Sequence, residues 1–257
     1  MCMYLNNLNP SVKALTILGL VAALALLFDP VTPALFTLCT IAVTFLFGDF
    51  RRKYYLFYLI PFTIFAIGML WTTIAFADAP KNPSETVGLI WWEVPREDVL
   101  VALSLSFRVL AFATMSLLFI FTTNMVEFLL SLMQQLRLPP KLAYGIMAGY
   151  RFLPMLTTEF RQIRAAHRVR GMGQESRWKR YRRFAVPLLA GAIRKAERTA
   201  VAMESKGFTG TRERTFYRNI RVRKKDWLFP AGMGAIFLLL ILLSLRFDYF
   251  SWYQGQL

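Results

Sequence analysis

The sequence has little of what catalytic and metal-binding sites need. Among 257 residues it has one histidine, His167, and two cysteines, Cys2 and Cys39. So few imidazole and thiol groups do not make a metal site, and the two cysteines do not favour a disulfide. The sequence also has no G-x-x-x-x-G-K-[ST] phosphate-binding loop. We therefore expect no catalytic activity, no metal and no cofactor in this chain.

Acidic residues are also scarce, with 15 Asp and Glu against 31 Lys and Arg, for a net charge of +16. Residues 122–226 hold 23 of the basic and 7 of the acidic residues, and the remainder holds 8 of each. A nucleic-acid-binding domain alone would not explain the mean hydropathy of +0.43. A simple bundle of lipid-exposed helices would not explain the charge. The apolar and basic properties are therefore separated along the chain.

Long apolar runs make up most of the neutral part of the chain. A membrane-spanning helix needs about 20 mostly apolar residues. Five stretches qualify, the first two only marginally: residues 12–28, 31–48, 54–77, 99–121 and 227–245. We expect an all-α, polytopic membrane protein with about five transmembrane helices and a cytoplasmic helical domain inserted before the last span. The expected domains are the membrane helices (1–121), the basic domain (122–226) and the last span with its tail (227–257).

The orientation in the membrane follows from the basic residues of the short loops, which favour the cytoplasmic side. Residues 51–53 are Arg-Arg-Lys, so this loop is expected inside. Residues 78–98 carry two basic and five acidic residues, so this loop is expected outside. The N-terminus and residues 122–226 are then cytoplasmic, and the C-terminus lies outside. Trp71, Trp91 and Trp92 are expected interfacial anchors of the outer loop.

The basic block is predicted to be helical. Its apolar residues recur at helical spacing from Met125 to Arg137, and residues 141–170 are predicted to form one or two long helices. Pro154 is expected to kink or divide them, and Pro187 is expected to begin the next helix. From Leu188 onward a stripe rich in small residues suits close approach of another helix. The stripe is formed by Leu189, Ala192 or Ile193, Ala196, Ala200 and Met203.

Several ionisable residues are expected to have structural rather than functional roles. Arg108 lies inside the fourth apolar stretch, and we expect it to pair with an acidic group or a helix carbonyl, or to snorkel outward, rather than to act in transport. Glu159, Glu197 and Glu204 each have basic residues within one helical turn, which favours local ion pairs over acid–base catalysis. His167 is expected at a surface or an interface.

Two segments of the basic block share an ending. Residues 164–171 and 202–208 are helix-forming stretches in which a basic residue is followed by glycine, at Arg170-Gly171 and Lys206-Gly207. A glycine after a cation is a common way to end a helix. Two such endings, 36 residues apart in one cytoplasmic domain, are less common.

Here the sequence resembles a known family, the transmembrane T components (EcfT/CbiQ-like) of energy-coupling factor (ECF) importers of vitamins and metal ions. The family has two Ala-Arg-Gly motifs, each at the end of a cytoplasmic coupling helix. Val169-Arg170-Gly171 and Ser205-Lys206-Gly207 keep the cation and the glycine but not the small residue, and the second has Lys for Arg. The resemblance extends from about Arg108 to Phe208.

The resemblance implies a mechanical role in a bacterial or archaeal cell membrane. Two ATP-binding-cassette (ABC) ATPase subunits each receive one coupling helix, bind the ATP, and transmit their motion to a separate substrate-binding S component. Arg170 and Lys206 are the implied docking cations, and Gly171 and Gly207 the implied turn formers. Their implied neighbours in the ATPase-coupling sites are Val169, Arg168, His167, Ser205 and Phe208. Anionic lipids are further expected partners of the basic block.

Two other functions fit parts of the sequence. One is a membrane enzyme that holds lipid-linked phosphates with its basic residues, although paired acidic residues and a histidine constellation are lacking. The other is a scaffold whose basic domain binds anionic lipid or RNA. Aromatic residues interleaved with the cations would favour RNA binding by stacking on bases, and only Trp178, Tyr181 and Phe184 are available. We therefore expect no nucleic-acid partner.

Overall fold

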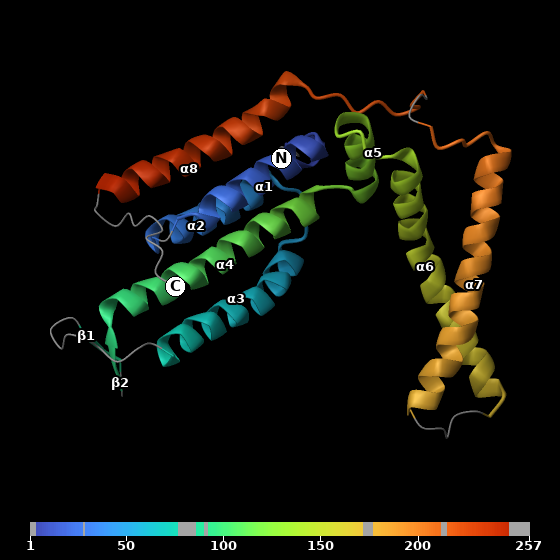
Figure 1. Ribbon diagram of the computed structural model, residues 1–257, viewed down its shortest axis with the longest axis horizontal. Coiled ribbons are helices and arrows are strands. Elements are labelled where there is room, and N and C mark those ends of the chain that lie inside the picture. The colour runs from blue at the N-terminus through green and yellow to red at the C-terminus, as the bar shows by residue number, and fades with distance from the viewer. Residues whose placement is uncertain are drawn as a thin grey trace. The chain divides into compact units, whose positions relative to one another are not determined.

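The structure is a computed structural model, and it describes residues 4–27, 29–76, 86–89, 92–171, 177–211 and 215–246 (Figure 1). The chain divides into two compact units. The membrane unit comprises Met1–Ser131 and Ile220–Leu257, and the helical-hairpin unit comprises Leu132–Asn219. The second unit is thus an insertion, so the chain leaves the membrane unit once and returns to it once.

Helices make up most of the membrane unit. Its elements are η1 (Leu5–Asn7), α1 (Pro10–Ala25), α2 (Val31–Phe47), α3 (Arg52–Ala75), α4 (Arg96–Thr122), η4 (Lys224–Trp227) and α8 (Leu228–Arg246). Helix α5 (Met125–Gln135) begins in this unit and ends in the helical-hairpin unit, which starts at Leu132. Among the described residues, three segments are long and apolar enough to cross a membrane: Arg52–Ala75, Asp98–Thr122 and Lys224–Arg246. The other two apolar helices, α1 and α2, are shorter, so the number of five spans stays a prediction.

Helix α4 is the centre of the membrane unit. It packs against α1, α2 and α3, while α8 packs against α1 and α2 (Figure 1). The core between them is apolar and includes Phe36 of α2, Met115 of α4 and Phe237 of α8. The rings of Phe36 and Phe237 meet edge to face, with centroids 5.6 Å apart. By contrast, only 11% of the spanning window of α3 is buried, which suits a helix that faces lipid.

A short β-hairpin precedes α4. Strand β1 (Thr86–Leu89) pairs antiparallel with β2 (Trp92–Pro95), with Thr86 opposite Pro95 and Leu89 opposite Trp92. The chain is predominantly helical, as the all-α prediction expects, and this short hairpin is an addition that the sequence did not predict. Residues 77–85, 90 and 91, with the expected anchor Trp91, lie outside the described residues.

Polar groups join the turn between α1 and α2 to two other helices. Asp29 is fully buried, and its Oδ2 accepts hydrogen bonds from the Thr32 amide (2.9 Å) and the Ser244 hydroxyl of α8 (3.0 Å). Arg108 of α4 donates to the carbonyl oxygen of Leu27. Leu27 lies two residues beyond the end of α1, so the partner of Arg108 is a carbonyl of the turn rather than of a helix. The bond ties α4 to this turn.

The helical-hairpin unit contains α6 (Pro140–Val169) and α7 (Arg177–Ser205). Two proline predictions are wrong in part. Helix α6 runs through Pro154 without a boundary, and α7 begins ten residues before Pro187, which lies inside it. A proline removes one backbone bond but does not end a helix whose neighbouring turns pack well. Pro139 and Pro140 begin α6 as N-cap and first residue, where the missing amide costs nothing.

Candidate functional site

The two long helices pack through complementary faces. On α6 the less exposed side chains recur at helical spacing, at Phe152, Leu156, Glu159, Ile163 and His167; on α7 they are Phe184, Leu188, Gly191, Lys195 and Thr199. The small-residue stripe predicted on α7 overlaps this face only in part. Leu189 is 61% and Ile193 59% exposed, whereas Ala192 lies beside Phe152 and Leu156 of α6.

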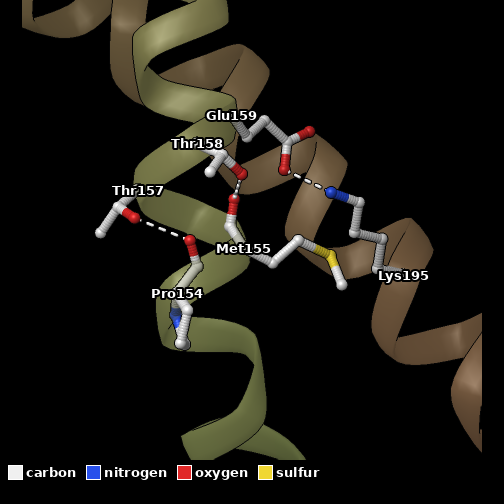
Figure 2. Close-up of polar contacts among 6 residues, drawn as sticks. All are labelled: Pro154, Met155, Thr157, Thr158, Glu159 and Lys195. Atoms are coloured by element: carbon white, nitrogen blue, oxygen red, sulfur yellow. Dashed lines mark hydrogen bonds and ion pairs between the residues drawn. The ribbon is translucent and has the colours of Figure 1, made fainter.

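An ion pair lies at the middle of the hairpin. The ammonium of Lys195 donates to Oε2 of Glu159 at 2.6 Å, from one helix to the other (Figure 2). A Cβ at Gly191 would come within 2.7 Å of Glu159 Oε1, so glycine leaves room for this carboxylate. The local ion pair expected for Glu159 is wrong, because its partner is on the opposite helix. Sequence spacing within one helix could not indicate this pairing.

Hydroxyl groups follow Pro154 in α6. Thr157 donates to the carbonyl oxygen of Pro154 and Thr158 to that of Met155, each at 2.7 Å (Figure 2). Such bonds to a carbonyl of the preceding turn are common for Ser and Thr in helices and can bend them. They satisfy the hydroxyls locally, so these threonines do not need a partner across the hairpin.

Aromatic contacts show that the hairpin is antiparallel. Phe208, after the end of α7, meets Tyr144 near the start of α6 edge to face at 5.4 Å. At the other end, the ring of His167 meets Phe184 at 5.1 Å. The two predicted cationic endings therefore lie at opposite ends of the hairpin. Since 23 residues separate Tyr144 from His167, the ends are about 35 Å apart at 1.5 Å per residue.

The first ending comprises Val169, Arg170 and Gly171. Helix α6 ends at Val169, Arg170 is its C-cap, and Gly171 has φ +69°. The Gly171 amide donates to the carbonyl oxygen of Arg168 at 3.1 Å, and the Arg170 amide donates to that of Ala166 at 3.2 Å. Glycine adopts this left-handed conformation without the strain of a Cβ. The predicted helix end is confirmed.

The second ending comprises Ser205, Lys206, Gly207 and Phe208. Gly207 has φ +81°, its amide donates to the carbonyl oxygen of Glu204 at 2.9 Å, and the Phe208 amide donates to that of Met203 at 3.0 Å. These two bonds form a Schellman motif, which satisfies the last carbonyls of the helix. Both helices are therefore followed by a left-handed glycine whose amide bonds to the carbonyl three residues before it, despite their different residues.

The cations of both endings are accessible. Arg168, Arg170, Ser205 and Lys206 are exposed, Val169 is 89% exposed, and His167 and Phe208 are half-buried against their aromatic partners. A cation beside a helix C-terminus interacts favourably with the helix dipole. Each end thus presents positive charge on a backbone that its own hydrogen bonds hold in place. Whether these residues bind an ATPase stays a prediction.

The described residues offer no cluster suited to metal chemistry. Among them no three His, Cys, Asp or Glu side chains lie close enough to hold an ion. Cys39, on α2, is a free thiol. Since His167 packs against a phenylalanine ring, its surroundings are those of an aromatic contact between helices. The arrangement is suited to binding another protein by charge and shape.

Similarity to known proteins supports a transport role. Residues 3–217 match the model of the CbiQ family, described as cobalt transport protein. The chain is 26% identical over 253 residues, 93% of each chain, to the energy-coupling factor transporter transmembrane protein EcfT of Lactococcus lactis. It is 29% identical over 202 residues to EcfT of Heliobacterium modesticaldum, covering 71% of this chain and 75% of the relative. Against EcfT of Limosilactobacillus fermentum the identity is 36% over 107 residues, 39% of this chain and 40% of the relative. The chain therefore belongs to the CbiQ family of multi-pass membrane proteins, whose members serve as transmembrane components of ECF transporters.

Proposed function

We propose that this chain is the non-catalytic coupling subunit of an ECF-type ABC importer. It transmits the ATP-driven motion of two ATPase subunits to a separate S component that binds a vitamin or a metal ion. The observation that carries the proposal is the pair of exposed cationic helix ends on one hairpin, Arg170-Gly171 and Lys206-Gly207. ATP is bound and hydrolysed by the partners.

The separation of the two ends supports two docking sites. Ends about 35 Å apart, estimated from the helical rise, are too distant for one groove of a small domain to hold both. Each end therefore suits its own ATPase subunit. Arg170 can make a bidentate contact with a carboxylate, whereas Lys206 acts as a point charge. Contacts between a cation and a carboxylate are about twice as strong as neutral hydrogen bonds.

The uncovered apolar side chains of the hairpin support a further, membrane-embedded partner. On α7 these include Leu189, Ile193 and Val201, the last 64% exposed, and on α6 they include Leu142 and Leu153, both 57% exposed. Since soluble proteins rarely leave such a series uncovered, the hairpin suits the apolar surface of an S component.

The proposed orientation gives the remaining charge a second partner. With the N-terminus and residues 122–226 cytoplasmic and the C-terminus outside, the basic block faces the inner leaflet, where anionic lipid attracts each cation by about 1 kcal/mol. This attraction depends on how close a cation lies to the headgroups and not on whether it ends a helix. Docking to an ATPase depends on the helix ends, so substitutions away from these ends serve as controls.

Charge reversal at the helix ends tests the proposal. Arg170→Glu and Lys206→Glu are compared with Arg161→Glu and Arg198→Glu, which change the charge equally at exposed positions away from the helix ends. Each variant is co-expressed with the ATPase and S-component genes, and ATPase recovery by pull-down and substrate uptake are measured. Recovery and uptake should fall at least tenfold for the two end variants and less than twofold for the controls.

Two outcomes would contradict the proposal. If both end variants still recruit ATPases and support normal uptake, the coupling role assigned to these ends is wrong. If all four variants lose activity equally, the basic block acts by its total charge, as a lipid-binding scaffold would. A Lys206→Arg variant should keep full recovery, because it preserves the cation at the end of α7.

A further inference from the structure

The N-terminal segment (residues 4–13) contacts both crossings between the two units. We name residues 122–131 the exit segment, where the chain leaves the membrane unit, and residues 220–228 the return segment, where it comes back. Both belong to the membrane unit. They are about 90 positions apart in sequence, so their common contact with the N-terminal segment is a tertiary feature.

Lys13 binds the start of the exit segment. Its side chain is 1% exposed, and its ammonium donates to the Thr122 carbonyl oxygen (3.0 Å), the Thr122 hydroxyl (3.1 Å) and the Thr123 hydroxyl (3.3 Å). A fourth bond, of 2.6 Å, goes to the carbonyl oxygen of Leu5. The Thr122 carbonyl is among the last of α4, which lack partners within the helix and favour a cation. A buried ammonium requires such a complete set of acceptors.

A second contact reaches further along the exit segment. The hydroxyl of Ser11 donates to the hydroxyl of Ser131 on α5 at 2.7 Å, and both side chains are buried. Glu127, also on α5, interacts electrostatically with Lys13. The N-terminal segment therefore holds the end of α4 and the face of α5 at once.

Asp226 joins the same segment to the return segment. It is 4% exposed; its Oδ1 accepts from the backbone amide of Asn9 at 3.3 Å and its Oδ2 from that of Arg223 at 2.7 Å. Asn9 is the N-cap of α1, so the carboxylate lies at the positive end of that helix dipole. A further bond runs from the Tyr4 hydroxyl to the carbonyl oxygen of Lys225 at 2.7 Å.

We propose that residues 4–13 form a clasp that holds the exit and return segments as one rigid base, with Lys13 and Asp226 as its positioning residues. The charges are complementary to the backbone they meet: a cation at the C-terminus of α4 and a carboxylate at the N-terminus of α1. Three residues and one helical turn separate Asn9 from Lys13, so displacement of one contact displaces the other.

The functional consequence of the clasp depends on the proposed function. If ATPases move the hairpin, a rigid base passes that motion to the membrane helices through both crossings. A loose base absorbs it, so ATP is hydrolysed without uptake. Lys13 and Asp226 belong to the membrane unit, whereas Arg170 and Lys206 belong to the helical-hairpin unit. Their loss should therefore change coupling and leave ATPase recruitment intact.

Hydrogen exchange tests the clasp without any partner. The full chain in lipid nanodiscs is compared with its Lys13→Met and Asp226→Ala variants, and exchange is followed in peptides covering residues 122–131 and 220–228. Each substitution should raise exchange at least tenfold in the segment it touches and at least threefold in the other segment. Thr16→Val is the matched control, because the Thr16 hydroxyl bonds only within α1, to Val12 (2.8 Å). It should leave both segments unchanged.

A milder variant covers the case in which Lys13→Met does not fold. Ser11→Ala removes only the bond to Ser131 and should raise exchange a few-fold in both segments. If each variant raises exchange only in the segment that it touches, the shared clasp is refuted. The shared clasp is also refuted if the effects of Lys13→Met and Asp226→Ala on exchange simply add in the double variant.

The functional arm measures substrate taken up per ATP hydrolysed in the assembled complex. Lys13→Met and Asp226→Ala should keep normal ATPase recovery and hydrolysis and lower this ratio at least fivefold, which a general loss of folded protein would not do. An unchanged ratio with raised exchange would overturn the coupling role of the clasp. If Arg170→Glu still recruits ATPases and supports normal uptake, while the clasp variants raise exchange in both segments, the proposed function is wrong and the clasp stands.

Discussion

Gly207 offers a substitution whose effect is set by backbone conformation alone. It has φ +81°, and a Cβ built on it meets no atom within 4 Å. Gly207→Ala therefore creates no clash, and its cost is that of placing an L-residue in the left-handed region, about 1–2 kcal/mol. The matched control is Gly149→Ala in α6, where a Cβ also meets nothing but the backbone is helical. That substitution should stabilise its helix by about 0.5–1 kcal/mol.

The assay is amide exchange in the last turn of α7. The amides of Gly207 and Phe208 donate the two Schellman bonds, so opening of the motif exposes both to solvent. A cost of about 1–2 kcal/mol corresponds to roughly 5- to 30-fold faster exchange at residues 206–208. Gly149→Ala should leave these amides unchanged and slow exchange around residue 149.

Equal exchange in the wild type and Gly207→Ala would refute this reasoning. Faster exchange at residues 206–208 in both Gly207→Ala and Gly149→Ala would also refute it, because a Gly-to-Ala change would then act regardless of φ. Gly207→Asn should lie between the wild type and Gly207→Ala, since Asn tolerates the left-handed region better than other L-residues.

Four further predictions concern other contacts. Gly191→Leu should force the Glu159 carboxylate away and break its bridge to Lys195, which should speed amide exchange in the middle of the hairpin. Lys195→Met should lower the free energy of unfolding by less than about 1 kcal/mol in a denaturant titration, because partly exposed ion pairs contribute little. Burial and then the charge of Asp226 raise the pKa of the Tyr4 hydroxyl above 10.0. The stability from this group is thus complete below pH 10 and is lost as pH rises through the higher folded pKa, so Tyr4→Phe should flatten the alkaline fall in melting temperature. Asp29→Ala should lower stability by about 1–3 kcal/mol in the same thermal assay, because the Ser244 hydroxyl and a helix-start amide lose a buried acceptor.

Sequence periodicity and composition were sufficient for the helices but not for the contacts between them. The five apolar stretches and the long helices of the basic block form where their patterns predict, because apolar periodicity and glycine endings are local signals. The β1–β2 hairpin was missed because its eight residues lie in a loop with no clear alternation. Pro187 was misread as a helix start because the residues before it are densely basic rather than amphipathic.

The contacts that the sequence could not predict are those between distant elements. Glu159 has basic neighbours on its own helix, so no local pattern distinguishes Lys195 as its partner. Lys13 was passed over as part of an apolar stretch, although a lysine among apolar residues is an unusual feature. That signal could have marked it as a buried group, but not its acceptors at Thr122 and Thr123, which are brought to it by the packing of α1 on α4.

The short first hairpin has a consequence for the surrounding lipid. Helices α1 and α2 have 16 and 17 residues, about 24 and 26 Å at 1.5 Å per residue, whereas α3 with 24 residues reaches about 36 Å. Against a hydrocarbon layer of about 30 Å, the protein has hydrophobic mismatch of opposite sign on its two sides. If α1 and α2 span the membrane, the bilayer would thin beside them, whereas α3 would tilt or the bilayer would thicken around it. Acyl-chain length would then act in opposite directions on the two kinds of helix.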